Sequence, residues 1–187
     1  RTMVNTRLGA GLLAVVLAMR LTTTTRPRFA ASAAEINRDV DRALRDLYAK
    51  GPKAKELTNR AKAVLVFPSI YKAGFMFGAQ YGDGALRQKG KTIGYYNSVA
   101  ASYGLQAGVQ KFGYALFFMT ASALEYLNKS GGFELGTGPS IAVLDTGAAT
   151  AFTSTTLQSD MYAIFFDQKG LMAGLGIQGS KISKINK

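Results

Sequence analysis

The sequence contains neither cysteine nor histidine among its 187 residues. Without them there is no disulfide, no thiol nucleophile, no Cys/His metal site and no imidazole base near neutral pH. The lack of cysteine also removes the disulfide framework that would have indicated an oxidising compartment. No serine lies in a G-x-S-x-G turn, and the acidic residues beyond residue 62 show no catalytic spacing. We therefore expect no enzymatic activity, no metal and no cofactor.

Acidic residues are scarce, since 11 Asp and Glu stand against 23 Lys and Arg, a formal net charge of +12. The excess is concentrated at the front of the chain, where residues 1–62 hold 13 basic and 5 acidic side chains. Such a distribution favours an acidic partner, which can be an anionic lipid surface, a nucleic acid or an acidic protein.

Near the start of the chain lies the apolar run LGAGLLAVVLAM, at 8–19. This run is too short to span a bilayer and is typical of the central part of an export signal. Ala31 and Ala33 offer a small-residue cleavage pattern further on, but no cysteine follows, as a lipoprotein signal requires. The alternative interpretation is a buried or fraying N-terminal helix.

The start of the chain also bears on domain organisation. Arg1 and Thr2 precede Met3, and we expect them to be additions ahead of the natural start. We expect residues 1–31 to form a signal-like segment and a flexible tail. Nothing resembling a linker follows, so residues 32–187 are expected to form one domain.

Two helices are predicted after this segment. Ser32 and Glu35 have the spacing of a capping box, which predicts a helix start. Gly51 and Pro52 predict the end of this helix and the start of a second one. An apolar stripe at helical spacing is formed by Ile36, Val40, Leu44 and Leu47. The basic side chains on the other faces are either an ordinary solvated surface or an electrostatic membrane contact.

Beyond residue 62 the chain consists of short strand-like runs broken by Gly, Asp, Asn and Lys. A short helix is expected at 121–128. Candidate strands lie at 64–67, 73–81, 92–96, 102–110, 113–119, 133–136, 140–144, 147–153, 161–166 and 171–178. Helices followed by many short strands predict the α+β class: N-terminal helices packed on a curved, largely antiparallel, Gly-rich sheet approaching a barrel.

Glycine is abundant, with 21 residues, and recurs at every fourth position at Gly74, Gly78 and Gly82. This step can mark a packing seam between membrane helices, but the glycine-spaced segments are too polar and glycine-rich for one. In a strand the even step places these glycines on one face, where they allow tight bending or the close approach of another element. Asp83 and Gly84 predict a hairpin turn at the end of this strand. The isolated G-x-G motifs are too short to predict a phosphate-binding loop.

Three stretches of the sequence together resemble the SYLF domain family. They are RAKAVLVFPSIYKAGFMFGAQYGDG, FELGTGPSIAVLDTG and YAIFFDQKGLMAGLGIQGSKI, and the resemblance extends over 36–182. The family's eukaryotic members carry SH3 or FYVE modules beside this domain, bind phosphoinositides and in some cases actin, and act in membrane remodelling. A copy without such modules behind a signal-like segment resembles the bacterial branch, whose members are exported proteins or lipoproteins. The resemblance therefore implies an exported, periplasmic or membrane-associated protein, with a lipid anchor only if a cysteine has been lost.

The resemblance implicates the basic N-terminal helices, together with Lys62 and Lys72, in lipid contact. The hypothesis is a non-enzymatic module that binds anionic phospholipid or phosphoinositide headgroups at a membrane surface. Its candidate lipid-binding residues are Arg38, Arg42, Arg45, Lys53, Lys55, Arg60, Lys62 and Lys72.

Two alternatives remain open at this point. One is an exported structural, assembly or protein-binding module with an actin-like partner and no specific lipid recognition. Another is a small outer-membrane barrel, which apolar–polar alternation in the strands permits. Nucleic-acid binding is not expected, because the basic residues precede the aromatic strands and do not interleave with them as a stacking platform requires.

Overall fold

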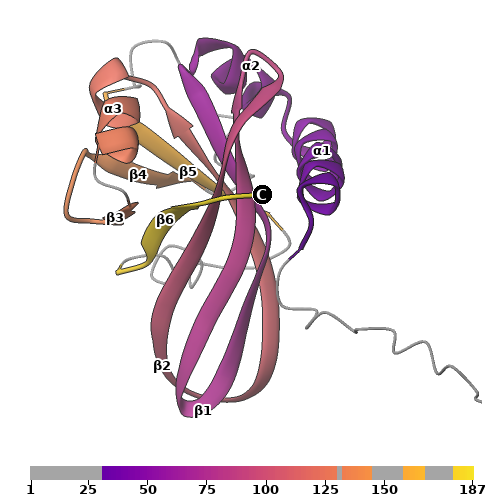
Figure 1. Cartoon of the computed structure of the whole chain (residues 1–187), viewed down its shortest axis with the longest axis vertical. Coiled ribbons are helices and arrows are strands. Elements are labelled where there is room, and N and C mark those ends of the chain that lie inside the picture. The colour runs from indigo at the N-terminus through magenta and orange to yellow at the C-terminus, as the bar shows by residue number, and fades with distance from the viewer. Residues whose placement is uncertain (1–30, 130–131, 145–157, 167–178) are drawn as a thin grey trace, which may run out of the picture.

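The computed structural model describes residues 31–129, 132–144, 158–166 and 179–187 (Figure 1). In chain order the elements are α1 (Ala33–Lys50), α2 (Pro52–Arg60), β1 (Ala63–Gln88), β2 (Lys91–Phe118), α3 (Ala121–Lys129), β3 (Gly132–Glu134), β4 (Ile141–Leu144), β5 (Met161–Phe166) and β6 (Lys181–Ile185). Within these ranges the strands form a six-stranded sheet in the order β3-β6-β2-β5-β4, with β1 paired to β2. Among the described strands, β4 and β5 pair in parallel and the other pairs are antiparallel. The predicted α+β class with a largely antiparallel sheet is confirmed.

The long β1–β2 ribbon curls so that the second part of β1 returns over its first part (Figure 1). Gly74, at φ +148°, lies at a register shift in this ribbon. Further along, a Cβ on Gly82 would collide with the carbonyl oxygen of Ser69 and lie 2.6 Å from Cδ1 of Ile70. Close approach of backbone at this position requires glycine. The predicted role of the glycines in a curved sheet is confirmed.

The predicted turn at Asp83-Gly84 is wrong. Both residues lie inside β1, where Asp83 pairs with Asn97 and Gly84 presses against the backbone of Val66. The ribbon turns instead at Lys89 and Gly90, with φ of +49° and +77°. These left-handed conformations between paired strands are typical of a two-residue hairpin turn. The Asp-Gly signal was misleading because glycine there serves a long-range contact.

The division of the sheet into short strands is also wrong in its first part. The candidates 64–67 and 73–81 are parts of β1, and 92–96, 102–110 and 113–119 are parts of β2. Register shifts let the ribbon bend without ending either strand. The sequence analysis missed β6, whereas the candidates 161–166 and 140–144 and the short helix are confirmed within a residue. The candidates 147–153 and 171–178 lie outside the described residues.

The sheet is buried on both faces where β1, β2 and β5 lie side by side. Leu65, Leu116 and Ala163 belong to a core on the side of α3. Val66 and Phe117 belong to a second core beneath α1 and α2. Burial on both faces explains why these strands are continuously apolar in sequence rather than alternating.

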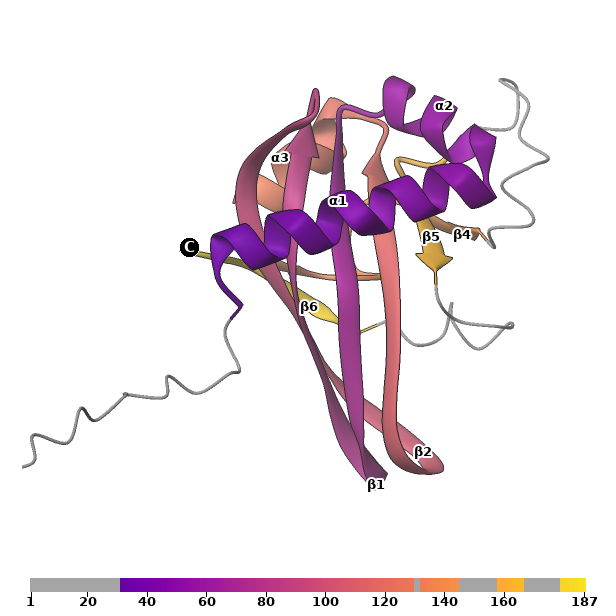
Figure 2. The same ribbon diagram turned by 90° about the vertical axis from the view of Figure 1, so that its right-hand side faces the viewer.

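Helix α1 lies across the strands of the ribbon (Figure 2). The predicted capping box is present, because the Glu35 amide donates to Ser32 Oγ and the Ser32 amide donates to the Glu35 carboxylate. Ile36, Val40 and Leu47 are buried against the sheet, as their spacing predicted. Hydrogen bonds to β2 fix the register of the helix: Asn37 Nδ2 donates to Tyr95 Oη at 2.8 Å, and Thr92 Oγ1 donates to Asn37 Oδ1 at 2.7 Å. The opposite face of α1 remains open to solvent.

Candidate functional site

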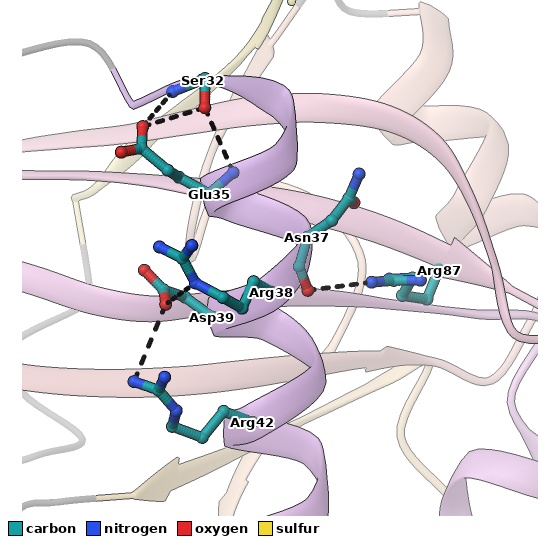
Figure 3. Close-up of polar contacts among 7 residues, drawn as sticks. All are labelled: Ser32, Glu35, Asn37, Arg38, Asp39, Arg42 and Arg87. Atoms are coloured by element: carbon teal, nitrogen blue, oxygen red, sulfur yellow. Dashed lines mark hydrogen bonds and ion pairs between the residues drawn. The ribbon is translucent and has the colours of Figure 1, made fainter.

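Two of the candidate arginines of α1, Arg38 and Arg42, lie on its outer surface. Arg38 Nε lies 3.8 Å and Arg42 Nη1 lies 3.9 Å from Asp39 Oδ1 (Figure 3). Each arginine side chain is 64% exposed. Ion pairs this long and this exposed contribute little to stability. The two arginines are therefore free to exchange Asp39 for another anion at little cost in folding free energy.

A groove lies between α1, the end of α2 and the β1–β2 turn, with a volume of about 520 Å³. Among the candidate residues it brings together Arg45 of α1 and Lys62, which precedes β1. It adds two basic residues from the turn, Arg87 and Lys89. We call it the hairpin groove, and its lining is Asp41, Leu44, Arg45, Tyr48, Thr58, Asn59, Ala61, Lys62, Ala63, Val64, Arg87, Lys89 and Gly90.

Arg87 is held in place at one side of this groove. Its Nη2 donates to Asp41 Oδ1 at 2.6 Å and to the carbonyl oxygen of Asn37 at 3.3 Å (Figure 3 shows the second contact). Its Nη1 donates to the carbonyl oxygen of Gly90 at 3.3 Å. The side chain is 14% exposed, and its buried Nε lacks a hydrogen-bond partner within the described residues. Arg87 thus ties α1 to the turn and keeps one N–H unused.

Lys62 and Lys89 are positioned through their backbone. The Lys62 amide donates to the carbonyl oxygen of Phe118 at 2.7 Å, and the Lys62 carbonyl accepts from Gln88 Nε2 at 3.2 Å. Lys89 occupies the first left-handed position of the turn, a conformation that lysine adopts only at a cost. Both ammonium groups are exposed and carry no ion pair within the part of the chain that the structure describes.

Tyr48 forms part of the wall of the hairpin groove. Burial raises the pKa of its phenol, and the hydrogen bond between its hydroxyl and Thr58 Oγ1, at 3.0 Å, acts in the opposite direction. Thr58 Oγ1 in turn donates to the carbonyl oxygen of Ala54 at 2.9 Å. The wall is therefore neutral at physiological pH, and the charge of the groove comes from its basic side chains and Asp41.

The remaining candidates do not line the groove. Lys55 and Arg60 are exposed on α2, and Lys53 is half-buried there. Lys72 is half-buried on β1, near the bend of the ribbon at Gly74. The structure therefore places the candidates in three settings: the outer surface of the helices, the hairpin groove and the far part of β1.

Sequence reasoning missed Asp41, Arg87 and Lys89 as members of the site. A signal was present, because RQKGK at 87–91 places three basic residues around a Lys-Gly turn. The local sequence could not show that this turn contacts α1. The contact is made by Arg87 and Asp41, which are 46 residues apart in the sequence. The contact depends on the curl of the ribbon.

The groove combines basic side chains, the side-chain amide of Asn59 and an apolar wall, a combination typical of binding sites. Among the described residues, no helix is both long and apolar enough to cross a membrane. Residues 99–187 match the family Ysc84, described as Las17-binding protein actin regulator. This segment therefore carries a Ysc84 (SYLF) domain match, in agreement with the resemblance found in the sequence.

The match begins inside β2, whereas α1, α2 and β1 precede it. All eight candidate lipid-binding residues therefore lie before the matched segment. A search of curated proteins finds no match to the chain. The family match supports a binding domain, and the assignment of its ligand depends on the charges described above.

Proposed function

We propose that this protein is a non-enzymatic module that binds anionic lipid headgroups, phosphoinositide-like in character, at a membrane surface. The observation that carries the proposal is the exposed basic surface of α1 and α2, which continues into the hairpin groove through Arg45 and Lys62. The proposed lipid-binding residues are the eight candidates, of which Lys72 lies apart from the others on β1: Arg38, Arg42, Arg45, Lys53, Lys55, Arg60, Lys62 and Lys72.

The strength of such a contact follows from its number of charges. A basic side chain near an anionic membrane contributes on the order of 1 kcal/mol, and the attraction falls off within a Debye length. Several residues acting together therefore suffice for reversible binding without a membrane-spanning element. The proposal needs no enzymatic step, no metal and no cofactor.

The test is sedimentation with vesicles of neutral phosphatidylcholine and with vesicles of rising phosphatidylserine or phosphoinositide content. We expect binding to rise with anionic content and to fall as salt is added. Replacing Arg38, Arg42 and Arg45 by Ala should weaken binding by about a hundredfold, because three charges of roughly 1 kcal/mol each are lost.

A matched control removes the same charge elsewhere on the surface. Lys129, Lys181 and Lys184 are exposed on α3 and β6, away from α1 in the chain. Their triple Ala variant should bind vesicles nearly as the unchanged protein does. Equal binding to neutral and anionic vesicles, or equal losses in both triple variants, would contradict the proposal.

The second candidate function is a protein-binding module with an actin-like partner. It is favoured by the family description, which names a Las17-binding actin regulator and applies to residues 99–187. Co-sedimentation with actin filaments, with and without anionic vesicles, distinguishes the two. Filament binding that survives the Arg38, Arg42 and Arg45 changes, together with no vesicle binding, would favour this second function.

We also propose that the protein is exported and is periplasmic or membrane-associated. The support is the apolar run at 8–19, which lies outside the described residues. Mass spectrometry of the protein expressed in bacteria should find a mature chain beginning near Ala31 to Ala33. An unprocessed chain in the cytoplasmic fraction would contradict this location.

A further inference from the structure

We propose that the hairpin groove is a site for one phosphomonoester group, and that Asp41 lowers its affinity by occupying Arg87 in the free protein. The inference rests on the proposed function, because it assigns a ligand class to part of the same basic surface. The groove site differs from the membrane contact in its selectivity. A surface contact needs only charge density, whereas a groove selects one chemical group by its shape.

The charges of the hairpin groove are the first argument. Arg45 lines it from α1, Lys62 from the residue before β1, and Lys89 from the turn. None of the three has an ion pair within the described residues. Together with Arg87 they exceed the one lining carboxylate, that of Asp41. A doubly charged oxyanion is the ligand that such convergence suits.

Arg87 supplies the second argument. Its contacts with Asp41 and with the carbonyl oxygens of Asn37 and Gly90 fix the guanidinium before any ligand arrives. Its Nε remains buried without a hydrogen-bond partner in the described part of the chain. An unsatisfied buried donor of this kind is costly, and a shift of the guanidinium toward an anion in the groove would relieve that cost.

The size and the wall of the groove indicate what kind of ligand it can hold. A volume of about 520 Å³ exceeds the needs of a bare phosphate ion. Leu44, Ala61 and Val64 provide apolar surface, and Asn59 provides an amide for hydrogen bonds. The occupant is therefore a phosphate ester of a small organic group. A lipid headgroup and a free metabolite share this chemistry.

The turn supplies the fourth argument. Lys89 is the only non-glycine residue with positive φ among the described residues, at +49°. Asn or Gly is the usual residue at this position of such a turn, so lysine is retained at a cost in stability. A binding role for its ammonium group accounts for that cost.

The experiment is a calorimetric titration of the full chain with inorganic phosphate and with glycerol 3-phosphate. We expect both to bind, the ester more tightly. Lys89→Asn should weaken ester binding about tenfold while raising the melting temperature, since it removes a charge and relaxes the turn. Lys129→Asn, an exposed change on α3, should alter neither the affinity nor the number of sites.

Asp41→Asn should strengthen ester binding several-fold, because Arg87 then meets the ligand without a competing carboxylate. Its amide oxygen can still accept from Arg87 Nη2, which keeps the guanidinium in place. Unchanged ester affinity in Lys89→Asn would overturn the site, and weaker binding in Asp41→Asn would overturn the role of Asp41.

Vesicle binding distinguishes a lipid headgroup from a free metabolite as the ligand. It also distinguishes failure of the groove proposal from failure of the membrane proposal. Ester binding without any vesicle binding leaves the groove in place, assigns it a free metabolite and rejects the membrane function. Vesicle binding without ester binding, and unaffected by Lys89→Asn, rejects the groove and keeps the membrane function. Preference for phosphoinositide over phosphatidylserine vesicles that Lys89→Asn abolishes supports both.

Discussion

At the scale of single residues, Asp160 shows how one side chain joins distant segments. Its carboxylate accepts from Ser140 Oγ at 2.8 Å, from the Ser140 amide at 3.1 Å and from Thr120 Oγ1 at 3.2 Å. It thereby links the start of β5 with the residues before β4 and α3. The hydrogen bonds from the Ser140 side chain and amide hold the pKa of Asp160 below its ordinary value of 3.8.

We expect Asp160→Asn to lower the free energy of unfolding at neutral pH by about 0.5–1 kcal/mol, since the carboxylate is partly exposed. A lowered folded-state pKa contributes stability above the unfolded-state pKa and loses it as pH falls through the folded-state value. The difference between variant and unchanged protein should therefore shrink below about pH 4. Urea unfolding across pH 3 to 7 measures this difference in the free energy of unfolding, with Glu125→Gln as the control. A difference independent of pH would contradict the role of the ionised carboxylate.

At the scale of elements, α1 and β1 differ in how much of their structure is local. The capping box at Ser32 and the apolar stripe of α1 follow from residues three or four positions apart, so they were predictable. The course of β1 depends on the return of its second part over its first, which brings Gly84 onto Val66. Even spacing of glycines predicted that something would approach the strand, without indicating that it is the strand itself.

Gly82→Ala tests this close approach. The added Cβ would meet the Ser69 carbonyl oxygen and lie 2.6 Å from Ile70 Cδ1, so the backbone must shift. We expect a loss of about 1–3 kcal/mol in the free energy of unfolding, as for other overpacked sites. Ala79→Ser, an exposed change on the same strand, serves as control in thermal unfolding. Equal melting temperatures for the two variants would show that the ribbon does not fold back this closely.

At the scale of the whole molecule, Lys187 connects the two ends of the described chain with the sheet. Its Nζ donates to the carbonyl oxygen of Ala31 at 2.8 Å and lies 3.1 Å from Asp83 Oδ2. The Asp83 side chain is 6% exposed and also accepts from Tyr81 Oη at 2.6 Å. Burial and the adjacent carboxylate raise the pKa of Tyr81 to about 12, so its hydroxyl remains a donor at physiological pH.

Lys187→Met should lower the free energy of unfolding by about 1.5–3 kcal/mol, because Asp83 is left charged and nearly buried. Asp83→Asn should lower the free energy of unfolding less in the Lys187→Met variant than in the unchanged protein, because the two side chains form one pair. Lys184→Met, an exposed change nearby, is the control in urea unfolding. Additive losses in the double variant would contradict a coupled pair.

The candidate site was predictable only in part. Arg45 and Lys62 were identified as basic residues of the N-terminal helices and of the segment that follows them. The groove that joins them to Arg87 was not, because its geometry is set by the hairpin turn and by the pairing of Arg87 with Asp41. Residue type alone did not show that Arg45 lines the groove whereas Arg38 does not. It also did not show that the chain turns at Lys89 and continues as a strand through Asp83.

The sequence by itself determined the helices, the α+β class, the need for glycine in β1 and the excess of positive charge. These follow from rules that act over a few residues or from composition, and they hold whatever the rest of the chain does. Only the tertiary structure decided where the ribbon turns and which cations share a groove. Those features depend on backbone contacts between residues far apart in sequence, such as Ser69 with Gly82 and Asp41 with Arg87.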